Sequence, residues 1–126
     1  MLIIRAEQMA TFKHYMLKSF EDDLVVHLNR YLPKQSADLG EEALRGFIRE
    51  GIHKAKSHGF TIEYDISRYI ALMLLLGREF DMDDKLPWAS EILADERLGG
   101  GRKTMDALYE KANAYLLHAK QEEGVP

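Results

Sequence analysis

Hydrophobic residues in the first quarter of the chain recur at steps of three and four, the spacing of one face of an α-helix. This stripe predicts a long helix from Ala6 or Glu7 to about Tyr31. Pro33 should end it, because proline offers no amide donor and pushes the preceding residue out of the helical conformation. The predicted face consists of Met9, Phe12, Met16, Phe20, Leu24, Leu28 and Tyr31.

A second helix is predicted to begin at Glu41 and to end before Gly59, after a short polar connection over residues 35–40. Acidic residues suit the first turn of a helix, and glycine suits the position just past its end. Gly46 and Gly51 lie inside this helix, where glycine costs up to about 1 kcal/mol against alanine, so we expect both to mark close helix–helix approaches. The buried stripe consists of Leu44, Phe47, Ile48, Gly51, Ile52 and Ala55.

The third predicted helix is apolar nearly all round. Thr61 is its expected N-cap, and only Ser67 and Arg68 give it a polar face. A helix of this kind is normally the buried centre of a bundle. Its apolar positions are Ile62, Ile66, Tyr69, Ile70, Leu72, Met73, Leu74, Leu75 and Leu76.

The rest of the chain predicts an acidic loop over residues 77–86 and two further helices. Pro87 suits the first position of a short helix that runs to about Ala94. Three glycines at 99–101 should break the chain before a last helix, and residues 121–126 should form a frayed tail. The last helix carries Met105, Leu108, Ala112, Tyr115, Leu116 and Ala119 on one face.

No segment shows the alternation of a β-strand. We therefore predict an all-α fold: a single-domain bundle over residues 1–126, with about five helices around a central, nearly all-apolar third helix.

The chain has 126 residues, no cysteine and a formal net charge of −4. Without cysteine there can be no disulfide framework and no Cys-type zinc site. The negative charge and the lack of a polybasic segment weigh against nucleic acid and anionic membranes as partners. We find no signal peptide and no apolar run near the ~20 residues that a membrane helix needs, so the expected location is cytoplasmic.

Known catalytic and metal-binding motifs occur only in incomplete form. Glu50 and His53 have the spacing of a di-iron ligand pair, but no second pair of this kind exists. Asp81 and Asp83 resemble the start of a calcium loop that lacks its glycine and its closing glutamate. The glycines before Arg102 have neither the spacing nor the preceding strand of a phosphate loop. We predict no enzymatic activity, no metal and no cofactor.

Negative charge concentrates between Glu79 and Glu96, where seven acidic residues and one basic residue give a net charge of −6, so the rest of the chain sums to +2. This segment is either a solvated loop or a docking rim with an aromatic anchor and charge-based steering. Trp88 could equally cap the core. The candidate protein-binding residues are Phe80, Asp81, Met82, Asp83, Asp84, Leu86 and Trp88.

A set of short motifs runs through about the first three-quarters of the chain. They comprise residues 1–9, Gly51, Ile52, His58, Gly59, Phe60, Thr61, Glu63, Asp65, Arg68, Tyr69, Ile70, Leu76, Gly77, Arg78, Glu79, Phe80, Asp81, Pro87, Trp88 and Ala89. In these motifs the chain resembles a family of small all-helical proteins encoded beside bacterial type VI secretion spike and effector genes. The family has no defined catalytic or ligand residues to transfer. The resemblance implies an auxiliary role, as a co-chaperone or adaptor that helps an effector reach the secretion spike alongside a larger adaptor protein.

We therefore expect a non-enzymatic protein-binding accessory whose partner is an effector, a larger adaptor chaperone, or both; self-association is left open. The alternative is an immunity protein that binds and neutralises a cognate toxin. Acidic immunity proteins often face basic nuclease toxins, and the segment between Glu79 and Glu96 would suit such a partner.

Overall fold

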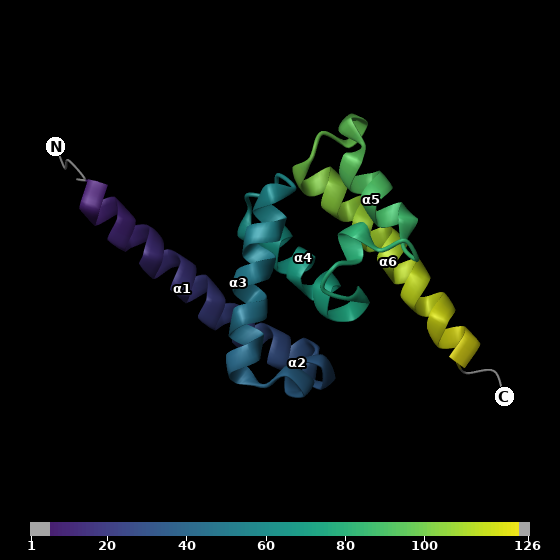
Figure 1. Cartoon of the computed structure of the whole chain (residues 1–126), viewed down its shortest axis with the longest axis horizontal. Helices are drawn as coiled ribbons and strands as arrows, with labels where there is room; N and C mark the ends of the chain where they lie inside the picture. The colour runs from purple at the N-terminus through teal and green to yellow at the C-terminus, as the bar shows by residue number, and fades with distance from the viewer. Residues whose placement is uncertain (1–5, 124–126) are drawn as a thin grey trace. The chain divides into compact units, whose positions relative to one another are not determined.

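The computed structural model describes the backbone of residues 6–123 and the side chains of residues 16–119 (Figure 1). This part of the chain contains six α-helices, two short 3₁₀ helices and no strand. The all-α fold class is therefore confirmed, with one helix more than predicted. The chain divides into two compact units, Met1–Arg49 and Glu50–Pro126. The expectation of a single domain over residues 1–126 stays a prediction.

The first unit contains three helical segments. They are α1 (Ala6–Tyr31), α2 (Pro33–Leu39) and the first part of α3 (Glu41–Ser57). α1 and α3 have the predicted bounds, but the predicted connection over residues 35–40 is wrong because most of it is helical. Pro33 cannot continue α1, but it lies in the first turn of α2. Backbone N–H groups in the first turn of a helix have no partner within the helix, so proline costs no hydrogen bond there.

The hydrophobic stripe of α1 is only partly buried. Leu24 and Leu28 have almost no exposed surface, as predicted. Met16 and Tyr31 are exposed, so this hydrophobic face is not buried along its whole length. The side chains of Met9 and Phe12, which were expected on the same face, lie outside the described residues.

The second unit contains the rest of α3 and five further elements. They are α4 (Glu63–Leu76), η1 (Phe80–Met82), α5 (Pro87–Ala94), η2 (Glu96–Leu98) and α6 (Gly101–Glu123). α5 has the predicted bounds. α6 continues through residues 121–123, and residues 124–126 lie outside the described residues, so the frayed tail over 121–126 stays a prediction.

α4 is the predicted central helix, and its burial is confirmed. Its buried residues are Asp65, Ile66, Tyr69, Ile70, Leu72 and Met73. Thr61 is not its N-cap, because the helix begins at Glu63, one residue later than that role requires. Ile62 occupies the N-cap position in an extended conformation and makes no side-chain cap hydrogen bond.

The two glycines inside α3 have different surroundings. A Cβ atom at Gly51 would lie 2.5 Å from Cγ1 of Ile70 and 3.1 Å from the sulfur of Met73, so α3 and α4 approach closely there. A Cβ atom at Gly46 would meet nothing within 4 Å. The predicted close approach is therefore confirmed at Gly51 and wrong at Gly46.

The remaining elements of the second unit pack around α4 and α6. α6 contacts both α4 and α5, and η1 contacts α4 and α5 (Figure 1). Three aromatic side chains meet in the core: the ring centroid of Tyr69 lies 6.0 Å from that of Phe60 and 5.1 Å from that of Phe80. This aromatic cluster lies directly under the predicted binding segment.

Candidate protein-binding site

The acidic turn, defined here as residues 79–86, is supported from inside by two buried apolar side chains. Phe80 and Leu86 are almost fully buried. The ring of Phe80 contacts that of Tyr69 on α4. Both residues were expected on a docking rim, but a buried side chain offers no surface to a partner. Their observed role is to hold the turn against the core.

Asp81 is also buried, and it links the turn to the end of α3. Its Oδ2 atom lies 2.9 Å from Nε2 of His58. An ionised carboxylate only accepts hydrogen bonds, so His58 donates through Nε2. Asp81 was predicted as part of an exposed acidic rim, whereas in the structure its charge faces a histidine inside the second unit.

Tyr69 lies beneath the turn, close to both His58 and Asp81. Burial raises the pKa of the Tyr69 hydroxyl well above its usual 10.0, and the negative charge of Asp81 raises it further. Within residues 16–119, neither this hydroxyl nor Oδ1 of Asp81 has a hydrogen-bond partner. The turn is therefore tied to a neutral tyrosine and an aromatic core.

Four residues of the turn are exposed, and Asp83 is half-buried. The exposed residues are Glu79, Met82 (76% exposed), Asp84 and Lys85. Asp83 shapes the turn, because its Oδ1 accepts a hydrogen bond from the backbone N–H of Lys85 at 2.9 Å and its carbonyl oxygen accepts one from Leu86 at 2.9 Å. The turn thus presents one flexible apolar side chain beside two carboxylates.

Trp88, in the first turn of α5, is half-buried. Its ring centroid lies 6.1 Å from that of Tyr115 on α6, and Tyr115 is 42% exposed. Trp88 therefore both covers part of the second unit and keeps an accessible surface. Whether a partner binds Met82, Asp83, Asp84 or Trp88 stays a prediction.

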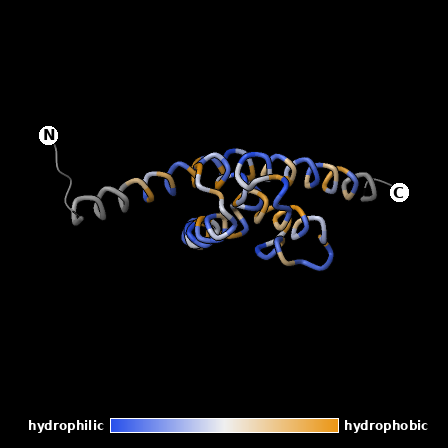
Figure 2. The backbone as a smooth tube through the Cα atoms, turned by 90° about the horizontal axis from the view of Figure 1, so that it is seen from above, coloured by the Kyte–Doolittle hydropathy of each residue, from blue (hydrophilic) through white to orange (hydrophobic). Residues whose placement is uncertain are grey.

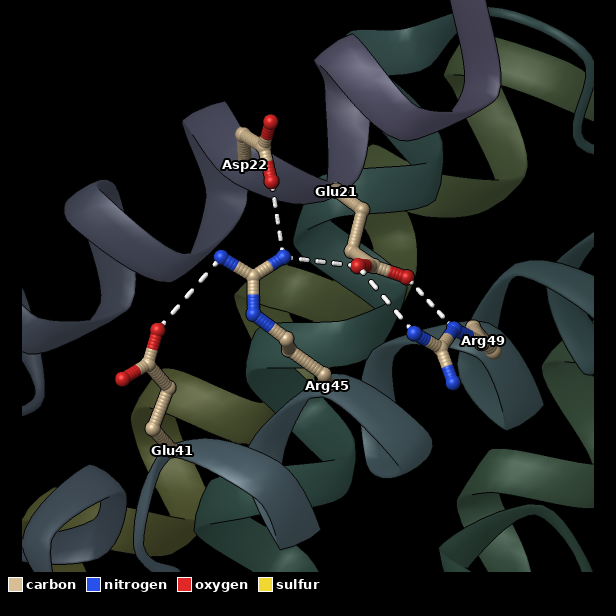
Figure 3. Close-up of polar contacts among 5 residues, drawn as sticks. All are labelled: Glu21, Asp22, Glu41, Arg45 and Arg49. Carbon is tan, nitrogen blue, oxygen red and sulfur yellow. Dashed lines mark hydrogen bonds and ion pairs between the residues drawn. The ribbon is translucent and has the colours of Figure 1, made fainter. Parts of the chain in front are cut away.

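The first unit contains a separate charged cluster around the buried Glu21 of α1 (Figure 3). Arg45 donates from Nη1 to Oε2 of Glu21 at 2.7 Å, and Arg49 donates from Nε to Oε1 at 2.6 Å. Arg45 also reaches Asp22 at 2.7 Å and Glu41 at 3.5 Å. Both oxygens of Glu21 accept hydrogen bonds from arginines of α3, so this cluster joins α1 to α3.

The ionisation of Glu21 reflects this pairing. Burial by itself would raise the pKa of its carboxyl group, but the hydrogen bonds from Arg49 and Arg45 and their positive charges outweigh it. The pKa of Glu21 therefore lies below its ordinary value of 4.5.

A third charged cluster joins the start of α4 to the start of α6. Oδ1 of the buried Asp65 accepts a hydrogen bond from Nε of Arg102 at 2.8 Å, and Arg68 lies 3.7 Å from the same oxygen. Arg68 also pairs with Asp106 at 2.8 Å, and its guanidinium group lies over the ring of Tyr109. Through these contacts Arg68 and Arg102 hold the start of α4 against the start of α6.

Among the described residues, no group of three or more His, Cys, Asp or Glu side chains could hold a metal ion. Glu50, from the di-iron-like spacing, instead pairs with Arg78 at 2.8 Å. None of the helices described has the length and apolar character needed to cross a bilayer.

Comparison of the chain with protein-family models, with curated proteins and with solved structures found no match. The site is therefore defined by its geometry alone.

Sequence reasoning missed the roles of His58, Tyr69 and Tyr115. The sequence pattern gave His58 no role beyond its place among the short motifs, and it gave Tyr69 an apolar position in the third predicted helix. A signal for Tyr115 was present, because the stripe of the last helix continues past Ala112 at unchanged spacing.

Proposed function

We propose that this chain is a non-enzymatic accessory protein that binds a type VI secretion effector, or the larger adaptor of that effector, and helps to load it onto the secretion spike. The resemblance of its sequence motifs to small proteins encoded beside secretion spike and effector genes supports this role. The observation that carries a protein-binding function is the exposure of Met82 and Asp84, with the half-buried Asp83 between them, on a turn that Phe80, Asp81 and Leu86 anchor in the core.

The anchoring matters because binding costs less free energy when the binding surface is already ordered. Phe80 and Leu86 are buried on either side of the exposed residues, and Asp81 is paired with His58 between them. Methionine adapts its shape to an apolar contact, and neighbouring carboxylates attract a basic partner. The acidic turn thus combines a fixed backbone with an adaptable apolar contact and a negative charge.

Charge reversal at the two outward-facing acids tests this assignment. The double variant Asp83→Lys, Asp84→Lys should weaken association with the effector or its adaptor by about tenfold at low salt, and by less at high salt, where surface charges are screened. Asp81 is left unchanged because it is buried against His58. Affinities would be measured by titration of the purified partner from the same gene cluster.

A matched control reverses the same number of charges elsewhere. Asp38 and Glu42 are exposed residues of the first unit, so the variant Asp38→Lys, Glu42→Lys changes the net charge equally. It should bind like the unchanged chain. Equal weakening by both double variants would contradict a site on the acidic turn and would indicate a general effect of net charge.

An immunity protein is the second candidate, because the net charge of −6 between Glu79 and Glu96 also suits a basic toxin. The two roles predict different phenotypes when the gene is deleted in the source bacterium. An accessory protein is required for effector delivery and leaves self-protection intact. Loss of self-protection with normal delivery, together with inhibition of the isolated toxin, would overturn the accessory role and support immunity.

A further inference from the structure

The hydrophobic stripe of α6 continues beyond the part of the helix that the core covers. Met105, Leu108 and Ala112 are almost completely buried. One turn later the same face carries Tyr115, which is 42% exposed, and then the half-buried Leu116 and Ala119. Figure 2 shows hydrophobic positions continuing along α6 toward its C-terminal end.

This uncovered face has room for a partner. α6 ends at Glu123, so the helix extends beyond Ala112 by about three turns, or roughly 16 Å. The ring of Trp88 on α5 contacts Tyr115 and borders the face at its near end. We call Trp88, Tyr115, Leu116 and Ala119 the distal stripe.

The sequence segment that contains Trp88 is mainly negative. Glu91 is exposed three residues after Trp88 on α5, a spacing that makes the two side chains neighbours on a helix surface. Asp83 and Asp84 precede Trp88 in the acidic turn. Lys85 and Lys111 oppose them, but the segment between Glu79 and Glu96 as a whole has a net charge of −6.

We propose that the distal stripe binds an amphipathic helix of the partner protein, with an apolar face on Tyr115, Leu116 and Trp88 and with lysine or arginine at its flanks. This inference rests on the proposed protein-binding function and names the kind of segment that is bound. Helix-in-groove recognition uses apolar anchors at this spacing, and the carboxylates would select basic flanks. A second copy of the chain is a poorer occupant, because stacking two distal stripes would bring two strongly acidic segments together.

A synthetic peptide can test the proposal without the natural partner. The probe is a fluorescein-labelled leucine–lysine peptide of about five helical turns, with leucines along one face. A second peptide with glutamate in place of every lysine keeps the same apolar face. Fluorescence anisotropy with the full chain should show binding of the lysine peptide that weakens with salt, and no binding of the glutamate peptide.

Two variants on α6 locate the binding face. Tyr115→Ser should weaken binding of the lysine peptide by roughly tenfold or more, as expected of an aromatic anchor. Leu117→Ser is the matched control, because Leu117 is 61% exposed and lies about 200° around the helix from Tyr115. It should change the affinity by less than about twofold, the scale of surface changes outside hot spots. Circular dichroism should show equal helix content in both variants.

Equal effects of the two variants, or none, would overturn the proposal. It would also be overturned if sedimentation equilibrium showed a dimer that Tyr115→Ser dissociates, because a second copy would then cover the stripe. If Tyr115→Ser leaves peptide binding unchanged while reversal of Asp83 and Asp84 abolishes effector association, this inference fails and the proposed function stands. If the peptide distinguishes the variants as expected but neither effector nor adaptor associates, the proposed function fails and this inference stands.

Discussion

The two units of the chain satisfy their buried carboxylates in different ways. In the first unit, each oxygen of Glu21 accepts a hydrogen bond from an arginine. In the second unit, Asp65 and Asp81 each have one paired oxygen, and among residues 16–119 the other oxygen of each has no hydrogen-bond partner.

Asp65 is also held by an arginine, Arg102, so the kind of partner differs only at Asp81. The side chains of Arg45 and Arg49 are 27% and 67% exposed, so the charges that hold Glu21 reach solvent. Asp81 instead faces His58 and Tyr69, beside the rings of an aromatic core. The first unit should therefore respond most to removal of charge, and the second unit to removal of packed aromatic volume.

The largest effect is expected in the second unit, at Tyr69. Tyr69→Ala should lower the free energy of unfolding by about 3–5 kcal/mol, because it opens a cavity among buried rings. Tyr69→Phe removes only a hydroxyl group without a hydrogen-bond partner and should change stability by less than about 1 kcal/mol. Urea unfolding followed by the fluorescence of Trp88, the only tryptophan, reports on this unit. Similar losses in both variants would show that the hydroxyl group, not the ring, provides the stability.

In the first unit, Glu21→Gln should lower the free energy of unfolding by about 1.5–3 kcal/mol. The neutral amide of glutamine makes weaker hydrogen bonds to the two arginines than the charged carboxylate does. The control Asp22→Asn removes an exposed partner of Arg45 and should cost less than about 1 kcal/mol. Hydrogen exchange of the α1 amides measures the loss within the first unit. Equal effects of the two substitutions would mean that the burial of Glu21 adds nothing to its ion pairs.

Two glycines of α3 allow the units to be compared within one helix, because Gly46 lies in the first unit and Gly51 in the second. Gly51→Ala should destabilise by about 1–3 kcal/mol, because its methyl group would lie against the buried Ile70. Gly46→Ala should stabilise by about 0.5–1 kcal/mol, because its added methyl group meets nothing and alanine favours the helix. Thermal unfolding of both variants checks the difference in sign. A stabilising Gly51→Ala would show that α3 and α4 can separate without cost.

The smallest effects concern pH, and they have opposite directions in the two units. The lowered pKa of Glu21 contributes stability that is present above its ordinary value of 4.5 and is lost as pH falls through the folded value. The raised pKa of Tyr69 contributes stability that is fully present at pH values below 10.0, the ordinary pKa of tyrosine. This stability is lost as the pH rises above 10.0 toward the folded pKa.

Acid should therefore weaken the first unit and alkali the second. Unfolding midpoints measured across the pH range should lose their acid slope in Glu21→Gln and their alkaline slope in Tyr69→Phe. Slopes that persist in these variants would assign the pH dependence to other groups.

Local sequence signals predicted the bounds of α1, α3 and α5 well, because helical periodicity, a terminal proline and charges near helix ends act over a few residues. α2 was missed because its seven residues are mostly polar and too few to show a stripe. Thr61 was misassigned because α4 begins without a side-chain cap, with Ile62 at the N-cap position, so the capping preference of threonine does not decide where the helix starts.

For the candidate site, the sequence identified the acidic segment but not the orientation of its side chains. Phe80, Asp81 and Leu86 alternate with exposed residues in a short irregular turn, where no period distinguishes buried from exposed positions. The same limit applied to Tyr115, whose exposure depends on where the core ends along α6.

The sequence by itself therefore determined the helices other than α2 and the burial of α4, because apolar spacing along a helix specifies which face must leave water. Only the tertiary structure decided which parts of the acidic segment are buried and which face outward. The physical reason is that burial in a turn depends on what packs beneath it, and His58, Tyr69 and the start of α5 reach the turn only in the folded second unit.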